Sequence, residues 1–130
     1  MNMPLLDTDF IISLSFSIES THEQAKLLAK KYLSINNAYY LDLVLHEVAT
    51  VVSKKHSHKK AVEICSVMRK NASSVLKLSP NDELKTWDFF NSQKNKNISF
   101  VDCANVVIAK KLGLKILSFD KFYDKFEFTL

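Results

Sequence analysis

The chain has 130 residues, 47% of them hydrophobic, and its 18 Lys and Arg exceed its 14 Asp and Glu to give a net charge of +4. This length suits one buried core, so we expect residues 1–130 to fold as a single domain. The basic excess favours a polyanionic partner over an acidic one. The single glycine, Gly113, excludes the glycine-rich phosphate loops of P-loop and dinucleotide-binding proteins.

The two cysteines, Cys65 and Cys103, match no metal-ligand spacing, so the sequence offers neither a disulfide framework nor a zinc site. No run of about 18 apolar residues indicates a membrane span, and the start of the chain does not resemble a targeting segment. We therefore expect a cytoplasmic protein that does not associate with membranes.

The first part of the chain predicts a strand followed by two helices. Residues 3–6 are a short apolar run that indicates a buried strand with Asp7 at its carboxyl end. A short helix is expected over 10–16. A Thr-x-x-Gln capping box then indicates a helix over about 21–34.

A second strand is expected over 39–41, and a helix follows it. Val44, Val48 and Val51 recur there at three- and four-residue steps, and Glu47 falls on the same helical face. The sequence therefore places this glutamate among apolar neighbours.

The middle of the chain predicts a helix over 57–71 and a third strand over 75–78. Ser79 and Pro80 have the residue types of an N-cap and a first helical position, so a further helix is expected from there. The polar stretch 91–97 indicates an exposed connection.

The last part predicts a helix from Phe100 to a left-handed stop at Gly113, and then a strand over 115–119 that ends at Asp120. Strands and helices thus alternate, which favours an α/β fold with a parallel sheet between helices. In such folds the reactive crevice lies at the carboxyl ends of the strands, where Asp7 and Asp120 are expected.

Four acidic residues stand inside apolar stretches: Asp7, Glu47, Asp102 and Asp120. A carboxylate is rarely buried without a partner, and several gathered carboxylates require a compensating cation. A hard divalent ion, Mg²⁺ or Mn²⁺, fits oxygen ligands better than zinc does. Taken singly, each acid could instead cap a helix or face solvent, and the joint pattern is what favours a metal site.

In their order and spacing these motifs resemble PIN domains, close to the VapC-type toxins of toxin–antitoxin modules. The landmarks are Leu-Asp-Thr at Asp7, a helical Glu47, Phe-Val-Asp-Cys-Ala at Asp102 and Leu-Ser-Phe-Asp at Asp120, and they span nearly the whole chain. The resemblance implies a three-layer α/β/α fold around a parallel sheet of strand order 3-2-1-4-5. It also implies a metal-dependent endoribonuclease that acts on RNA, a homodimer, and an antitoxin protein as partner.

Carried over residue by residue, the resemblance implies that Asp7, Asp102 and Asp120 ligate Mg²⁺ or Mn²⁺, and that Glu47 does so directly or through water. The metal would lower the pKa of a bound water and orient it for in-line attack on a phosphodiester. Whether one or two ions act stays open.

Four neighbours are possible supporting residues. Thr8 and Asp9 follow the first aspartate, where Asp9 is either a further acidic contributor or a helix N-terminal charge. Ser118 matches a small hydroxyl residue that the resembling family has two positions before its last aspartate. Asp124 could replace Asp120 as a ligand if the turn differs.

A basic segment offers possible RNA contacts through Lys54, Lys55, Lys59 and Lys60. An ordinary solvated junction between helices explains these lysines equally well. Trp87, Phe89 and Phe90 could stack on bases, but the helical spacing of Trp87 and Phe90 favours the core.

Two other functions stay open. One is a housekeeping PIN nuclease of RNA maturation or decay, and the other is a PIN-like module that binds RNA or protein without cutting. Apolar residues over 10–18 and 21–32 could serve either a dimer or an antitoxin helix.

Overall fold

Strands and helices alternate along the chain, as the sequence predicts. The computed structural model describes residues 3–33, 37–71 and 74–126. In chain order its elements are β1 (Pro4–Leu6), α1 (Thr8–Ser15), α2 (His22–Tyr32), β2 (Tyr40–Leu41), α3 (Asp42–Lys55), α4 (His58–Lys70), β3 (Val75–Leu76), α5 (Pro80–Ser92), α6 (Phe100–Leu112), β4 (Lys115–Leu117) and the 3-10 helix η2 (Lys121–Lys125).

The strands are short and parallel. β1 pairs with β4, and β2 pairs with β3. Tyr39 joins the two pairs, because its carbonyl accepts from the Leu6 amide at 2.8 Å and its amide donates to the Pro4 carbonyl at 2.9 Å. The described strands therefore lie in the order β3-β2-β1-β4. The full expected order 3-2-1-4-5 stays a prediction, because the described residues contain no fifth strand.

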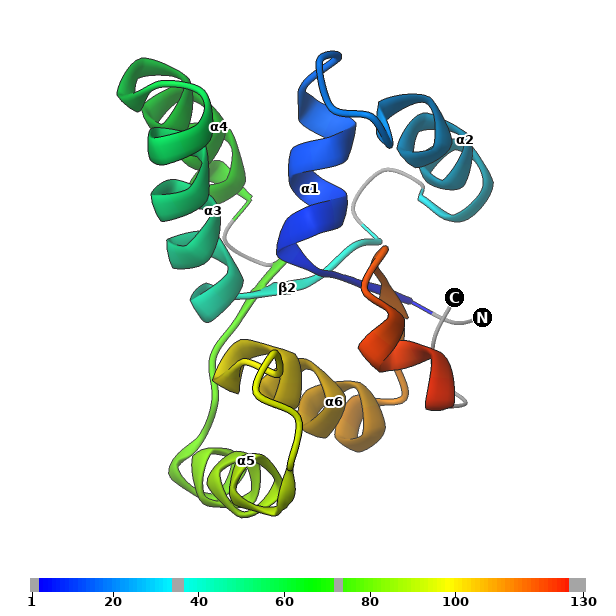
Figure 1. The fold of residues 1–130 in the computed structure, drawn as a ribbon, viewed down its shortest axis with the longest axis vertical. Coiled ribbons are helices and arrows are strands. Elements are labelled where there is room, and N and C mark those ends of the chain that lie inside the picture. The colour runs from blue at the N-terminus through cyan, green and yellow to red at the C-terminus, as the bar shows by residue number, and fades with distance from the viewer. Residues whose placement is uncertain (1–2, 34–36, 72–73, 127–130) are drawn as a thin grey trace.

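Helices cover both faces of this sheet (Figure 1). The helices α1 to α4 lie on one side, where α3 packs on α4 and α1 packs on both α2 and α3. On the other side α5 packs on α6. The three-layer α/β/α arrangement predicted from the sequence is therefore confirmed.

The core of the first helical layer shows which face of α3 is buried. Val44, Val48 and Val52 are fully buried at four-residue steps, whereas Val51 and Glu47 are partly buried. The sequence placed Val51 on the face of Val44 and Val48, and Val51 packs against the edge of this core. Glu47 and Val51, also four residues apart, form the neighbouring ridge, which faces a pocket.

The start of α5 and the end of α6 agree with the sequence. Ser79 caps α5, and Gly113 ends α6 with a left-handed φ of 68°. The expected capping box of α2 is wrong, because the Thr21 side chain makes no cap hydrogen bond and its hydroxyl instead bonds that of Ser13. The predicted end of this helix at residue 34 lies outside the described residues.

Trp87 is 43% exposed, so its expected place in the core was wrong. It lies on the outer layer, where α5 has α6 as its packing partner, and its ring contacts Phe100 at 4.4 Å between centroids. Among the described helices, none is both long enough and apolar enough to cross a membrane.

Candidate active site

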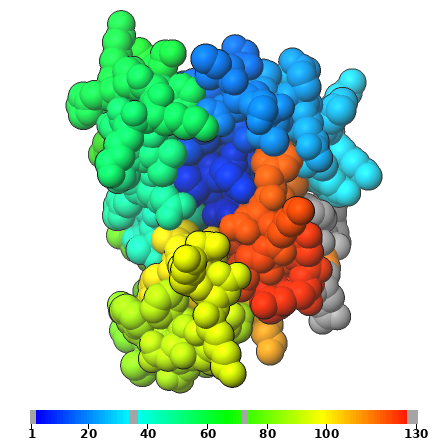
Figure 2. Space-filling model, viewed as in Figure 1, coloured from blue at the N-terminus to red at the C-terminus, as the bar shows by residue number. Residues whose placement is uncertain are grey.

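The carboxyl ends of β1 and β4 open into a pocket of about 350 Å³. Figure 2 shows the start of α1, in dark blue, at the bottom of a hollow between α3 and the orange-red segment that follows β4. The acidic residues that line this pocket are Asp7, Asp9, Glu19, Glu47, Asp102 and Asp120. All four acids singled out in the sequence therefore line one pocket, although they come from separate segments of the chain.

Asp7 lies at the end of β1 and is 4% exposed. Its Oδ1 accepts hydrogen bonds from the Thr8 amide at 2.9 Å and from Asn105 Nδ2 at 3.1 Å. Its Oδ2 accepts from the Ser118 hydroxyl at 3.1 Å. The carboxylate is thus held on both oxygens while it caps the first turn of α1.

The surroundings of Asp7 disfavour its charge. Burial, followed by the neighbouring charges of Asp9 and Asp102, raises the pKa of Asp7 to about 7, against the opposing hydrogen bonds from Thr8 and Ser118. A carboxylate with this environment gains from a nearby cation, because a positive charge restores the ionised form.

Asp9 joins the first helix to the end of the last strand. Its two oxygens accept from the Ser118 hydroxyl at 3.0 and 3.2 Å and from the Phe119 amide at 3.3 and 3.2 Å. Burial raises the pKa of Asp9, and these hydrogen bonds oppose that shift. Asp9 therefore fixes the position of Ser118, the hydroxyl that also contacts Asp7.

Asp102 occupies the third position of α6, so the alternative that it is the N-cap was wrong. Ser99 is the cap, and a reciprocal capping box joins Ser99 and Asp102 through two hydrogen bonds of 3.0 Å. The other oxygen of Asp102 accepts from the Tyr123 hydroxyl at 3.2 Å. Burial is the main cause that raises the pKa of Asp102; the Ser99 amide opposes it, and the charge of Asp120 adds to it.

The remaining predicted acids are more open to solvent. Asp120 is exposed and caps η2, because its carboxylate accepts from the Phe122 amide at 2.9 Å. Glu47 is partly buried, and its side chain forms no ion pair with another described residue. Asp124 is exposed and does not line the pocket, so its position does not support the alternative ligand role.

Two buried residues below the carboxylates were missed in the sequence. Asn105 Nδ2 donates to Asp7 and also to the Tyr123 hydroxyl at 3.1 Å, and both side chains are fully buried. Burial and the charges of Asp7 and Asp102 raise the pKa of Tyr123, which keeps the phenol protonated as a donor. The signal in the sequence was a polar Asn105 inside the otherwise apolar run of α6.

The buried carboxylates of this pocket have no lysine or arginine partner within the described part of the chain, where the ion pairs involve Glu19, Glu23 and Asp82. An all-oxygen donor set with uncompensated negative charge fits a hard divalent cation. As they stand, however, no three His, Cys, Asp or Glu side chains of the described residues are placed to hold one ion together. The residue types fit the metal, while a ready-made ligand set is not formed.

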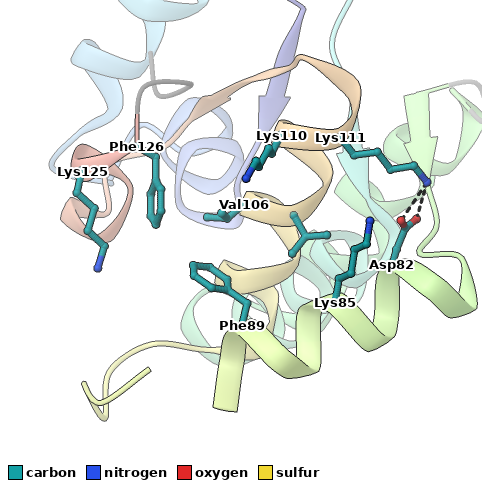
Figure 3. Close-up of a pocket in the computed structure, with 9 residues that line it drawn as sticks. Asp82, Lys85, Phe89, Val106, Lys110, Lys111, Lys125 and Phe126 are labelled. Atoms are coloured by element: carbon teal, nitrogen blue, oxygen red, sulfur yellow. Dashed lines mark hydrogen bonds and ion pairs between the residues drawn. The ribbon is translucent and has the colours of Figure 1, made fainter. Parts of the chain in front are cut away.

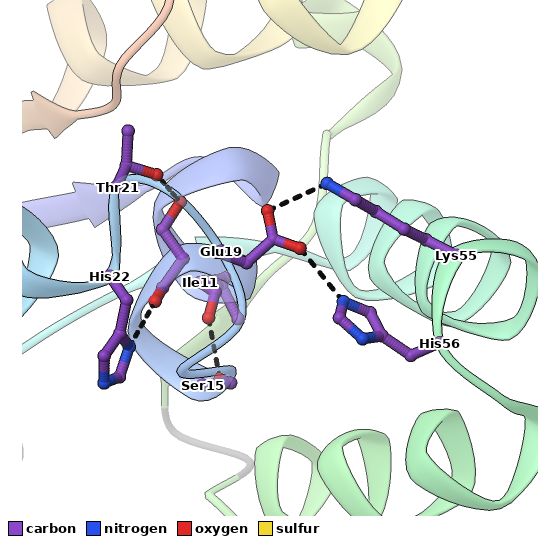
Figure 4. Close-up of polar contacts among 8 residues, drawn as sticks. Ile11, Ser15, Glu19, Thr21, His22, Lys55 and His56 are labelled. Atoms are coloured by element: carbon purple, nitrogen blue, oxygen red, sulfur yellow. Dashed lines mark hydrogen bonds and ion pairs between the residues drawn. The ribbon is translucent and has the colours of Figure 1, made fainter.

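A lysine also lines the pocket, and Figure 4 shows its ion pair with Glu19. Lys55 lines it from the last turn of α3, and its Nζ lies 2.8 Å from Glu19 Oε1. The second oxygen of Glu19 lies 3.0 Å from His56 Nε2, and the His56 ring stacks on Phe16 at 4.1 Å between centroids. Lys54, Lys59 and Lys60 are exposed and do not line the pocket.

A parallel sheet between two helical layers, with an acidic pocket at the carboxyl ends of its strands, defines a three-layer α/β/α protein with its site at the strand ends. The PIN domain family matches residues 5–128, so the chain belongs to the PIN-domain family. The expectation drawn from the motifs is thereby confirmed.

The fold is similar to the crystal structure of VapC20 from Mycobacterium tuberculosis, described as a toxin that cleaves the sarcin-ricin loop. The TM-score is 0.81 at 20% sequence identity, over 93% of this chain and 92% of that one. Among curated proteins, none matches the sequence significantly.

Proposed function

We propose that this chain is a metal-dependent endoribonuclease that hydrolyses RNA phosphodiester bonds. The observation that carries the proposal is that five carboxylates line one pocket: Asp7, Asp9, Glu47, Asp102 and Asp120. Within the described residues, no lysine or arginine forms an ion pair with the buried ones. Membership of the PIN-domain family and the fold shared with an RNA-cleaving toxin support it.

In this proposal Asp7, Asp102 and Asp120 hold Mg²⁺ or Mn²⁺, and Glu47 holds it directly or through water. When bound, the ion supplies a water of lowered pKa and neutralises charge on the reacting phosphate. Four hard oxygen ligands suit these ions.

The residues around the ligands keep the carboxylates in place. Ser118 holds Asp7 and Asp9 together, and Tyr123 holds Asp102 through its phenol hydrogen. Asn105 links the Asp7 and Asp102 sides by donating to Asp7 and to Tyr123. Repulsion between the carboxylates is thus opposed by neutral donors until a cation binds.

Lys55 supplies the contact to the substrate backbone. Its ammonium group lies at the rim of the acidic pocket, where Glu19 fixes it. A lysine meets a phosphate as a point charge, which positions a strand without reading its bases.

We further propose that residues 1–130 act as one domain, that the protein works in the cytoplasm as a homodimer, and that it is the toxin of a toxin–antitoxin module with an antitoxin protein as partner. The fold shared with VapC20 supports this choice. A small reading frame next to the gene, whose product binds this chain and blocks cleavage, is the expected accompaniment.

The test is cleavage of a stem-loop RNA by the purified protein with Mg²⁺ or Mn²⁺ and with EDTA. We expect cleavage with metal, none with EDTA, and none from Asp7→Asn or Asp102→Asn proteins whose circular dichroism matches the wild type. Lys54→Gln, an exposed change outside the pocket, is the control that keeps activity. Cleavage by either aspartate variant at the wild-type rate would contradict the proposal.

A further inference from the structure

A second and larger pocket, of about 880 Å³, lies between α5, α6 and η2 (Figure 3). Its walls are apolar and partly aromatic. Phe89 of α5 and Phe126 meet edge to face at 6.1 Å between ring centroids, and Val106 of α6 lies beside them. This volume lies in the range of pockets that hold small organic ligands or single nucleotides.

Lysines surround these apolar walls. Lys85, Lys110 and Lys125 line the pocket, and none of the three forms an ion pair with a carboxylate of the described chain. Figure 3 shows them on three different elements around the same opening. The ammonium group of Lys125 lies 5.6 Å from the centroid of the Phe126 ring, so positive charge and an aromatic surface adjoin each other.

The one acidic residue of the pocket is already neutralised. Asp82 is buried, and its two carboxylate oxygens lie 3.0 and 3.1 Å from Lys111 Nζ. The hydrogen bond from Lys111 is the main cause that lowers the pKa of Asp82. The remaining charge of the pocket is therefore positive, and its complement is an anion.

Helix α6 contributes residues to both this pocket and the acidic one. Asp102, Val106 and Lys110 follow one another at four-residue steps and so share one helical face. Asp102 lines the acidic pocket, while Val106 and Lys110 line the second one. At 1.5 Å per residue the distance along the helix from Asp102 to Lys110 is about 12 Å.

We propose that this second pocket binds an unpaired nucleotide of the RNA, next to the bond that is cut, an inference that rests on the proposed function. The base lies against Phe89 and Phe126, and the adjoining phosphates contact Lys85, Lys110 and Lys125. Flat aromatic walls beside unpaired ammonium groups are the chemistry that single-stranded nucleic acid requires. The substrate then enters as a stem-loop or other RNA with an unpaired nucleotide beside the cleavage site.

The test measures RNA binding without cleavage. A fluorescein-labelled single-stranded RNA of about 12 nucleotides is titrated with the protein in EDTA and followed by fluorescence anisotropy. The pocket variant is Lys85→Gln with Lys110→Gln. The matched control is Lys30→Gln with Lys70→Gln, which removes the same charge from exposed positions on α2 and α4, across the sheet.

We expect the pocket variant to bind the RNA at least about fivefold more weakly than the control, with a salt slope smaller by about 1.4. A Phe89→Leu variant keeps an apolar side chain and removes the stacking face, so it also loses affinity while its circular dichroism stays unchanged. Equal affinities of the pocket and control variants would overturn the inference. So would a pocket variant that changes oligomeric mass in light scattering with unchanged RNA affinity, because the pocket would then bind a second copy of the chain.

The two proposals fail separately. Because the titration contains EDTA, its result does not depend on cleavage. If the wild type cleaves RNA with metal and both lysine variants bind RNA equally, only the proposed nucleotide pocket is refuted. If the wild type does not cleave RNA and the pocket variant clearly loses RNA affinity, the proposed nuclease activity is refuted and the RNA-binding pocket stands.

Discussion

Single carboxylates in this site have two kinds of contact at once. Asp7 caps α1 and also faces the pocket, and Asp102 does the same within the capping box of α6. From the sequence, helix capping and metal binding are competing explanations for such residues. In the folded chain they are compatible, because a carboxylate has two oxygens with several acceptor positions.

The raised pKa of Asp7 predicts that the metal-free protein loses stability as pH rises. The folded pKa of about 7 exceeds the ordinary aspartate pKa of 3.8, so the folded state binds more protons between these values and the free energy of unfolding falls across this window. Asp7→Asn removes the cost of burying the charged carboxylate. We therefore expect it to stabilise the metal-free protein by roughly 2 kcal/mol or more at pH 8 and not at pH 4.

Urea unfolding in EDTA at the two pH values measures this difference. Asp88→Asn, at an exposed position of α5, is the control with the same chemical change. An Asp7→Asn protein that is less stable than the wild type at pH 8 would show that the carboxylate is stabilised by partners instead of being strained.

The phenol of Tyr123 is predicted to support the carboxylates that are the proposed metal ligands. Tyr123→Phe removes the donor to Asp102 and the acceptor of Asn105, so we expect metal affinity or kcat to fall about 10-fold or more, with a stability loss of about 1 kcal/mol. Tyr40→Phe is the matched control, because the Tyr40 hydroxyl donates to the Met68 carbonyl away from the site. Mn²⁺ titration calorimetry and cleavage rates separate the two variants; equal metal affinity and kcat in both would contradict the role.

At the scale of elements, the short strands place the site and the helices supply it. β1 and β4 have three residues each, and the segment after each one delivers acids to the pocket. Helix α3 delivers two groups of opposite charge from the same side, Glu47 near its middle and Lys55 in its last turn. Two positions eight residues apart lie about 12 Å apart along a helix, so α3 lines the pocket over this length, from Glu47 to Lys55.

This placement predicts different effects for neighbouring lysines of α3. Lys55→Gln removes the ammonium group at the pocket, and we expect KM for the RNA to rise about fivefold or more with a smaller dependence on salt. Lys54→Gln, at an exposed position one residue away, is expected to change KM and its salt dependence less than Lys55→Gln does. Initial cleavage rates at several salt concentrations measure the effect, and an equal rise of KM in both variants would refute a specific contact by Lys55.

At the scale of the whole molecule, charge is separated over the surface. The chain carries a net charge of +4, yet six of its 14 acidic residues line one pocket. Lys55 lines this pocket, and Lys85, Lys110, Lys111 and Lys125 line the second pocket. In the proposed function, the net positive charge attracts the RNA and the acidic pocket holds the cation.

Metal is therefore predicted to stabilise the fold. In the proposed function Mg²⁺ or Mn²⁺ binds the native pocket and not the unfolded chain, so a concentration 100 times the Kd is expected to add about 2.7 kcal/mol to the free energy of unfolding. We expect Tm to rise by several degrees with Mn²⁺ at pH 8 and by less at pH 5, where the ligands are more protonated. Thermal melts with Mn²⁺ and with EDTA measure the shift, and a wild-type shift no larger than that of Asp7→Asn would contradict binding at this pocket.

The sequence by itself determined the features that depend on neighbouring residues. Periodicity predicted the α/β alternation, Gly113 predicted the end of α6, and the apolar context of Asp7, Glu47 and Asp102 singled out residues that line the pocket. These are local properties, because helical spacing, φ above zero and burial of a short run are set within a few residues.

Only the tertiary structure decided how distant segments meet. It brought Tyr123 and Asn105 under the carboxylates, buried Val52 more deeply than Val51, and selected Lys55 from a basic segment of similar lysines. It also formed the second pocket, with Phe89 and the lysines around it, which no sequence motif indicates. The physical reason is that such contacts depend on the packing of whole layers, and no local pattern of residues contains that information.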